Sequence, residues 1–188
     1  AREDQKFGIA IEDVPGLVEK IRKHNHLEFL GLHSHIGSQI FETAGFAEAA
    51  RRLIKLHSAL LAGGAVPELN LGGGFGIDYN VGDNAPSIKA TADAIVDAIA
   101  VACQSEGVQV PKLAFEPGRA IVGRAGVTLY TVGTIKDVNL GEGVIRKYVS
   151  VDGGMSDNAR TALYQAEYST RLVSRVTSAA PALVRVVG

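Results

Sequence analysis

The sequence has little of what secreted, membrane and nucleic-acid-binding proteins usually carry. Cys103 is the one cysteine among 188 residues, so no disulfide can form within the chain. The formal net charge is −1, from 19 basic and 20 acidic residues, which gives no reason to expect a nucleic acid as partner. Charged residues interrupt the hydrophobic runs well before these reach the length that spans a membrane.

From these absences we expect a globular protein in a reducing compartment. Hydrophobic residues make up 46% of the chain, which suits one globular unit or most of one. Residues 1–6 are polar, and no apolar segment of the kind found in a secretory signal follows them. We therefore expect a cytoplasmic protein, without a membrane or nucleic-acid partner and without a metal site.

Strand-like and helix-like segments alternate through the first two thirds of the chain. Apolar spacing predicts strands at residues 7–11, 27–32, 69–71 and 113–115, and helices at residues 14–24, 44–61 and 87–104. Helical connections between strands of this length indicate a parallel α/β sheet or barrel.

The pattern changes after about residue 123. Strands are predicted at residues 127–135, 147–151, 168–176 and 183–187, with one helical or turn-like segment at residues 156–164. Strands without helices between them favour antiparallel pairing. We therefore expect two domains, an α/β domain over residues 1–124 and a β-rich domain over residues 125–188.

Three polar or glycine-rich segments directly follow predicted strands. They are residues 33–39, 72–76 and 116–119. The active site of an α/β barrel lies on the loops at the carboxyl ends of its strands. We therefore expect the three segments to meet at one place, which is a stronger signal than any one of them.

Each segment also has a plain structural explanation. The four glycines of residues 72–76 form either a flexible loop or a nest of N–H groups for a phosphate. His35 is either a hydrogen-bonded loop residue or an imidazole that lies over a cofactor ring. Glu116 either forms a salt bridge with Arg119 or pairs with a protonated ring nitrogen, as pyridoxal phosphate requires.

Four motifs, in this order, resemble the diaminopimelate decarboxylase family of the alanine-racemase-like, fold-type III pyridoxal phosphate enzymes. The motifs are His35-Ile-Gly-Ser-Gln39, Gly72-Gly-Gly-Phe-Gly-Ile77, Glu116-Pro-Gly-Arg119 and Val151-Asp-Gly-Gly-Met-Ser-Asp-Asn-Ala-Arg160-Thr-Ala-Leu-Tyr164. The last motif is the most specific, because related ornithine and arginine decarboxylases differ there. The resemblance implies that residues 1–124 are the C-terminal part of a pyridoxal-phosphate-binding (β/α)8 TIM barrel and that residues 125–188 begin a β-rich domain.

The resemblance also implies roles for the matching residues. His35, which would stack on the cofactor ring, and Glu116, which would pair with the pyridinium nitrogen, are the catalytic candidates. The full cofactor-binding set is His35, Ser38, Gly73, Gly74, Glu116, Gly118 and Arg119. The distal end of the substrate would be bound by Arg119, Arg160 and Tyr164, since a guanidinium matches a carboxylate.

The implied reaction is the decarboxylation of meso-2,6-diaminopimelate to L-lysine and CO2, the last step of lysine biosynthesis. The small amino-acid substrate would be bound by a homodimer of the full-length chain. One alternative is a related decarboxylase acting on ornithine, arginine or carboxynorspermidine. Two others are a non-catalytic homologue and a phosphate-binding barrel enzyme that does not use pyridoxal phosphate.

The chain departs from the family pattern in two places. It has no Tyr-Ala-x-Lys-Ala type segment, which in the family supplies the Schiff-base lysine, and it lacks the Cys-Glu-Ser-Gly-Asp loop. We therefore expect a central segment of the enzyme that is inactive in isolation. The missing lysine is also what motivates the non-catalytic alternative.

Overall fold

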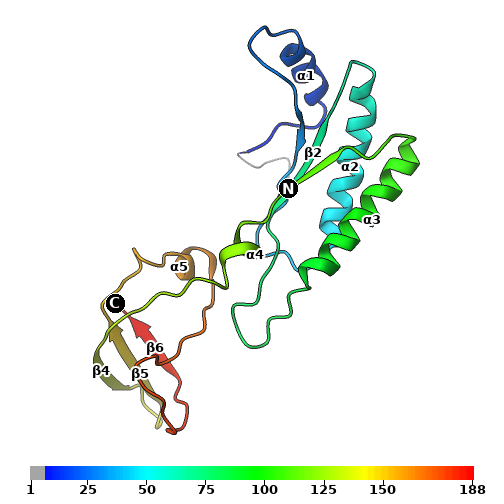
Figure 1. Ribbon diagram of the computed structural model, residues 1–188. Coiled ribbons are helices and arrows are strands. Elements are labelled where there is room, and N and C mark those ends of the chain that lie inside the picture. The colour runs from blue at the N-terminus through cyan, green and yellow to red at the C-terminus, as the bar shows by residue number, and fades with distance from the viewer. Residues whose placement is uncertain (1–6) are drawn as a thin grey trace. The chain divides into compact units, whose positions relative to one another are not determined.

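The structure, a computed structural model, describes residues 7–188, which divide into two compact units (Figure 1). The first unit holds the residues up to Asp78 together with Asn84–Ala125. The second unit holds Tyr79–Asp83 and Gly126–Gly188. Each unit contains a three-stranded sheet. Within residues 7–188, no helix is both long enough and apolar enough to cross a membrane.

The sheet of the first unit consists of three parallel strands in the order β1-β2-β3. Its strands are β1 (Gly31–His33), β2 (Glu68–Gly73) and β3 (Lys112–Glu116). Helix α2 (Ala44–Leu61) connects β1 to β2, and helix α3 (Ile88–Glu106) connects β2 to β3. Parallel strands joined by crossover helices confirm the predicted α/β class.

Two shorter helices belong to the same unit, α1 (Val14–Arg22) and α4 (Gly118–Val122). The strand predicted at residues 7–11 is wrong, because these residues form bends, turns and irregular backbone. The side chain of Phe7 is 80% exposed, and no strand pairs with this segment within the described residues. Apolar alternation makes a stable strand only where a neighbour accepts its hydrogen bonds and covers one face.

The core of the first unit lies between one face of the sheet and the helices α2 and α3, which run side by side (Figure 1). Its buried side chains repeat at the period of each element, every second residue on a strand and every third or fourth on a helix. They include Leu32, Leu69 and Leu71 from the strands and Phe46, Ile54, Ile95 and Ile99 from the helices. Cys103 of α3 is also buried, and burial raises the pKa of its thiol.

The opposite face of this sheet is polar. Glu68 and Asn70 alternate with buried leucines along β2, so their side chains point away from the helices. Glu68 forms an ion pair with Lys112 of β3 at 2.9 Å. The sheet therefore has one face built for packing and one face that carries charged and polar side chains.

The side chain of Arg22, the last residue of α1, joins that helix to the end of α2. Its Nη1 donates to the carbonyl oxygen of Leu60 at 3.1 Å, and its Nη2 donates to those of Gly64 and Ala65, both at 2.9 Å. The guanidinium also lies 5.2 Å from the centroid of the Phe29 ring. One guanidinium therefore ties α1 to carbonyl groups at the end of α2 and in the turn that follows it.

The second unit contains the antiparallel strands β4 (Val132–Asn139) and β5 (Ile145–Val151) and the strand β6 (Val184–Val187). β6 pairs with β5 in parallel, whereas the sequence predicted antiparallel pairing. The long connection between them contains helix α5 (Arg160–Tyr164) and returns the chain to the start of β5 before β6 begins. The strand predicted at residues 168–176 is wrong, because this segment is irregular and pairs with no strand among the described residues.

His57 of α2 is a buried polar side chain in the core of the first unit. It is 3% exposed, and its Nδ1 has no hydrogen-bond partner among the described residues. Burial lowers the pKa of the His57 imidazole, because the charged form loses its hydration. As the pH falls below about 6.5, the unfolded chain takes up a proton here before the folded chain does, and this difference destabilises the fold.

We expect the substitution His57→Leu to reduce the loss of stability between pH 7 and pH 5, because it removes this proton uptake. Thermal unfolding followed by circular dichroism at both pH values measures the effect. His26→Leu, which removes an exposed imidazole, is the matched control and should behave as the wild type. An H57L variant with the pH dependence of the wild type would contradict the assignment.

Candidate functional site

The loops after the three parallel strands lie together at the carboxyl edge of the sheet. The N–H of Ile40, in the loop after β1, donates to the carbonyl oxygen of Gly74 at 2.9 Å. The N–H of Gly76 donates in turn to the carbonyl oxygen of Ile40 at 3.0 Å. Arg119, which follows β3, reaches the loop after β1, where its Nη2 donates to Ser38 Oγ at 2.5 Å. The structure thus brings all three polar segments noted in the sequence to one edge.

Two glycines allow the segments to approach this closely. A Cβ at Gly73 would lie 2.0 Å from the carbonyl oxygen of Glu116, and a Cβ at Gly74 would lie 2.1 Å from that of Gly37. Gly74 also has a φ of +89°, a conformation that residues with a side chain rarely adopt. The register between β2 and β3 shifts between Asn70 and Gly73, as in a β-bulge.

Side chains from the neighbouring segments hold the start of the glycine loop. The N–H of Gly72 donates to Asn70 Oδ1 at 2.8 Å, and the N–H of Gly73 donates to His35 Nδ1 at 3.3 Å. Because Nδ1 accepts this bond, the proton of the neutral His35 ring lies on Nε2. The His35 side chain is otherwise exposed, so it is anchored at one nitrogen and remains accessible.

Gln39 connects the loops that follow the three strands, a role that the sequence pattern does not indicate. Its Nε2 donates to the carbonyl oxygen of Ile77 at 2.6 Å, and the N–H of Ile77 donates to its Oε1 at 3.2 Å. Arg119 Nη1 donates to the same Oε1 at 3.1 Å. One amide therefore fixes the end of the glycine loop and helps to orient the arginine. The only signal in the sequence was its place at the end of a polar segment.

Glu116, at the end of β3, is held by two side chains to which the sequence pattern assigned no role of their own. His33 Nε2 lies 3.2 Å from Glu116 Oε1, and Asn70 Nδ2 donates to the same oxygen at 3.1 Å. A cavity of about 250 Å³ on the polar face of the sheet is lined in part by these three residues. His33 was expected in the polar segment that follows the strand, but it and Asn70 both lie within strands, where the register determines which side chains they contact.

The remaining candidates divide between the two units. Gly118 and Arg119 are the first two residues of α4, directly after β3 and Pro117. Arg160 and Tyr164 belong to α5 of the second unit, where the guanidinium carbon of Arg160 lies 5.3 Å from the centroid of the Tyr164 ring. Tyr164 is 69% exposed. The structure therefore pairs these two residues with each other and leaves them in a different unit from the other candidates.

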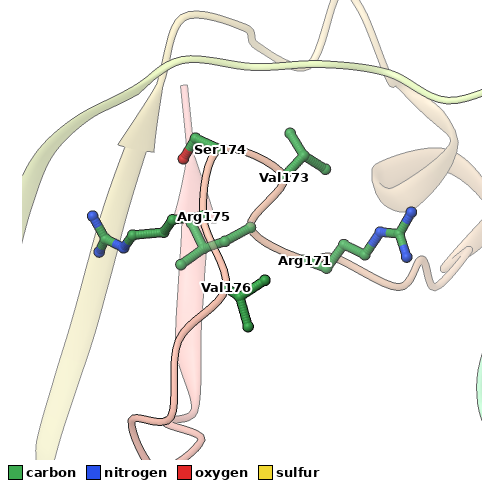
Figure 2. A pocket seen from close by; sticks show the side chains of 6 residues that line it. Arg171, Val173, Ser174, Arg175 and Val176 are labelled. Atoms are coloured by element: carbon green, nitrogen blue, oxygen red, sulfur yellow. The ribbon is translucent and has the colours of Figure 1, made fainter.

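A larger cavity in the second unit does not gather functional groups. It has a volume of about 460 Å³ and is lined by six consecutive residues, 171–176. Figure 2 shows that the side chains of Arg171 and Arg175 point away from each other. Binding sites usually hold a few polar groups that converge on one ligand. None of the candidate residues lines this cavity.

Known proteins resemble this chain in both sequence and structure. The family described as "Pyridoxal-dependent decarboxylase, pyridoxal binding domain" matches residues 1–123. The diaminopimelate decarboxylase of Mycobacterium bovis is 47% identical over 197 residues, which cover 100% of this chain and 44% of that protein. The diaminopimelate decarboxylase of Bacillus subtilis is 42% identical over 191 residues, which cover 100% of this chain and 43% of that protein.

Solved structures give the same picture. The crystal structure of diaminopimelate decarboxylase from M. jannaschii in co-complex with L-lysine matches with a TM-score of 0.78 and 32% identity. This match covers 89% of the chain and 38% of that structure. The chain therefore spans less than half the length of the relatives that it matches.

We expect the substitution Gly74→Ala to destabilise the first unit by about 1–3 kcal/mol, because the new methyl group meets the Gly37 carbonyl and the residue keeps a positive φ. Chemical denaturation measures the difference. Gly16→Ala in α1 is the matched control, since nothing lies within 4 Å of a Cβ there and alanine favours a helix. Equal stability of the two variants would contradict the close contact.

Proposed function

The chain belongs to the family of pyridoxal-dependent decarboxylases, and from this we propose that it is part of a diaminopimelate decarboxylase. The full-length protein would convert meso-2,6-diaminopimelate to L-lysine and CO2. Relatives that are 42–47% identical over the whole chain carry this name, and a solved neighbour was crystallised with L-lysine. The observation that carries the proposal is the convergence of His35, Glu116 and Arg119 at the edge of one sheet.

The side chains at this edge fit pyridoxal phosphate. Glu116 Oε1 is taken by His33 and Asn70, whereas Oε2 has no partner among residues 7–188. This oxygen is therefore available to accept a hydrogen bond from a protonated ring nitrogen. His35 is anchored through Nδ1 and accessible, as a ring that stacks on the cofactor must be. The absence of a Cβ at Gly74 lets the glycine loop close against the loop after β1.

Each residue at this edge then has a distinct task. Bound pyridoxal phosphate supplies an electron sink for the carbon that loses CO2. Glu116 holds the proton at the ring nitrogen, and His35 orients the ring from one side. The phosphate would be bound by Ser38 and Gly74 together with the main chain of Gly118 and Arg119, whereas the N–H of Gly73, which the resemblance also assigns to the cofactor, donates to His35 Nδ1. The Ser38 hydroxyl already accepts a hydrogen bond from Arg119, so both are in place before an anion arrives.

The substrate has a carboxylate at each end, and the distal one requires a cation. We assign this task to the guanidinium groups of Arg119 and Arg160, because a guanidinium binds a carboxylate with two parallel hydrogen bonds. We assign the same task to Tyr164, whose ring lies beside Arg160. Arg160 and Tyr164 belong to the second unit, whereas Arg119 belongs to the first.

The larger architecture follows from the same proposal. Residues 1–124 would form the C-terminal part of a (β/α)8 barrel, and residues 125–188 would begin the β-rich domain. The polar sheet face with the Glu68–Lys112 ion pair would then face the barrel interior. We place the full-length protein in the cytoplasm as a homodimer.

We expect Glu116→Gln in the full-length protein to lower the rate of decarboxylation about 100-fold or more, because a neutral amide does not hold a proton at the ring nitrogen. Release of CO2 from meso-diaminopimelate measures the rate. Glu28→Gln, an exposed carboxylate ahead of β1, is the control and should leave the rate unchanged. If the wild-type protein released no CO2 from this substrate, the proposed reaction would be rejected.

We expect Arg160→Gln to raise the KM for meso-diaminopimelate about 10- to 100-fold, which corresponds to the loss of hydrogen bonds to a charged group. The KM for L-lysine or L-ornithine as a poor substrate should change little, because neither carries a distal carboxylate. Arg171→Gln removes an exposed guanidinium from the same unit and serves as the control. Equal changes for substrates with and without the second carboxylate would count against this role.

A further inference from the structure

Three polar side chains meet on the face of the first sheet that points away from the helices. His33 is the last residue of β1 and lies opposite Asn70 of β2 in the parallel register. Asn70 lies opposite Ala114, two residues before Glu116 on β3. Side chains two residues apart on a strand share a face, so Glu116 extends from the same face as its two partners.

His33 and Asn70 both contact the same oxygen of the Glu116 carboxylate. His33 Nε2 and Asn70 Nδ2 lie 3.2 Å and 3.1 Å from Glu116 Oε1. The Asn70 amide cannot turn around without losing both of its bonds, because its Oδ1 accepts the N–H of Gly72 at 2.8 Å. Oε2 of Glu116 has no partner within the described residues.

We propose that His33 is a positioning residue. Together with Asn70 it holds the Glu116 carboxylate so that Oε2 can accept a hydrogen bond from the protonated ring nitrogen of the cofactor. This inference rests on the proposed function. The Glu116 side chain is 53% exposed, so without the Asn70 hydrogen bond and the His33 contact its carboxylate would rotate and bind water. An acceptor that is oriented in advance does not have to be reorganised when its partner arrives.

His33 is the better of the two residues for a test. Asn70 also binds the glycine loop, so changing it would disturb the cofactor site in two ways. Glu116 is the one side-chain partner that the structure gives to His33 within residues 7–188. The His33 side chain is 52% exposed, so substitutions there do not disrupt the core.

The experiment compares two cofactors in the full-length protein. One is pyridoxal phosphate, and the other is its 1-deaza analogue, in which a C–H group replaces the ring nitrogen. The dissociation constant of each is measured by titrating the apoprotein and following the absorbance of the bound cofactor. We expect His33→Leu to weaken the binding of pyridoxal phosphate about tenfold, as the loss of one polar contact to a charged group predicts, and to change the affinity for the analogue less than about twofold.

Two further variants define the geometry of the effect. His33→Gln places an amide donor near the position of Nε2 and should restore most of the affinity for pyridoxal phosphate. His33→Asn has a shorter side chain that does not reach Oε1, so it should behave like H33L and replaces that variant if H33L does not fold. His26→Leu, which removes an exposed imidazole elsewhere in the same unit, should bind both cofactors as the wild type does.

The outcomes separate this inference from the proposed function. If the wild-type protein bound neither cofactor, the proposed function would fail. If the wild type bound pyridoxal phosphate but H33L and H33N weakened both cofactors equally, His33 would have only a structural role. Unchanged affinity for both cofactors in these variants would likewise overturn the positioning role and leave the proposed function intact.

Discussion

The candidate site depends on the close approach of the main chain on either side of β2. At Gly73 this strand touches the carbonyl of Glu116, and at Gly74 it touches the carbonyl of Gly37. No residue with a side chain could occupy either position without moving a strand end. The polar groups of the loops after β1 and β3 can therefore reach the glycine loop directly. His35, Gln39 and Asn70 complete this contact by accepting N–H groups of the loop.

The alternation of side chains along the strands lets the same sheet carry both stability and chemistry. Leu32 and Leu69 face α2 and α3, while His33 and Asn70 face the opposite way. The packing of the helices therefore fixes the strands, and the strands fix the separation of the polar side chains. This explains how Glu116 comes to be held by residues from two other strands, although all three side chains are open to solvent or only partly buried.

Local signals explain which parts of the fold could be predicted from the sequence. The helix predicted at residues 44–61 has these bounds in the structure, and α3 begins after Ser87, whose Oγ accepts the N–H of Ala90. Strands were predicted near each strand that has a neighbour, although β1 and β4 begin four or five residues later than predicted. The predictions failed at residues 7–11 and 168–176, where no strand pairs with them among the described residues. The site shows the same limit. Polar motifs after strands could be recognised, but the partners of Glu116 follow from the register, which one sequence does not reveal.

The contacts of Arg22 couple two segments that are far apart in the chain. One guanidinium binds three carbonyls at the end of α2 and in the turn toward β2, and it also lies against Phe29 just before β1. Unwinding of α1 would release all of these carbonyls at once. In native-state hydrogen exchange, α1 and the connection between α2 and β2 should therefore open as one cooperative element. That element connects to β1 and β2 at their amino ends. Its opening would therefore disturb the sheet at the edge opposite the candidate site.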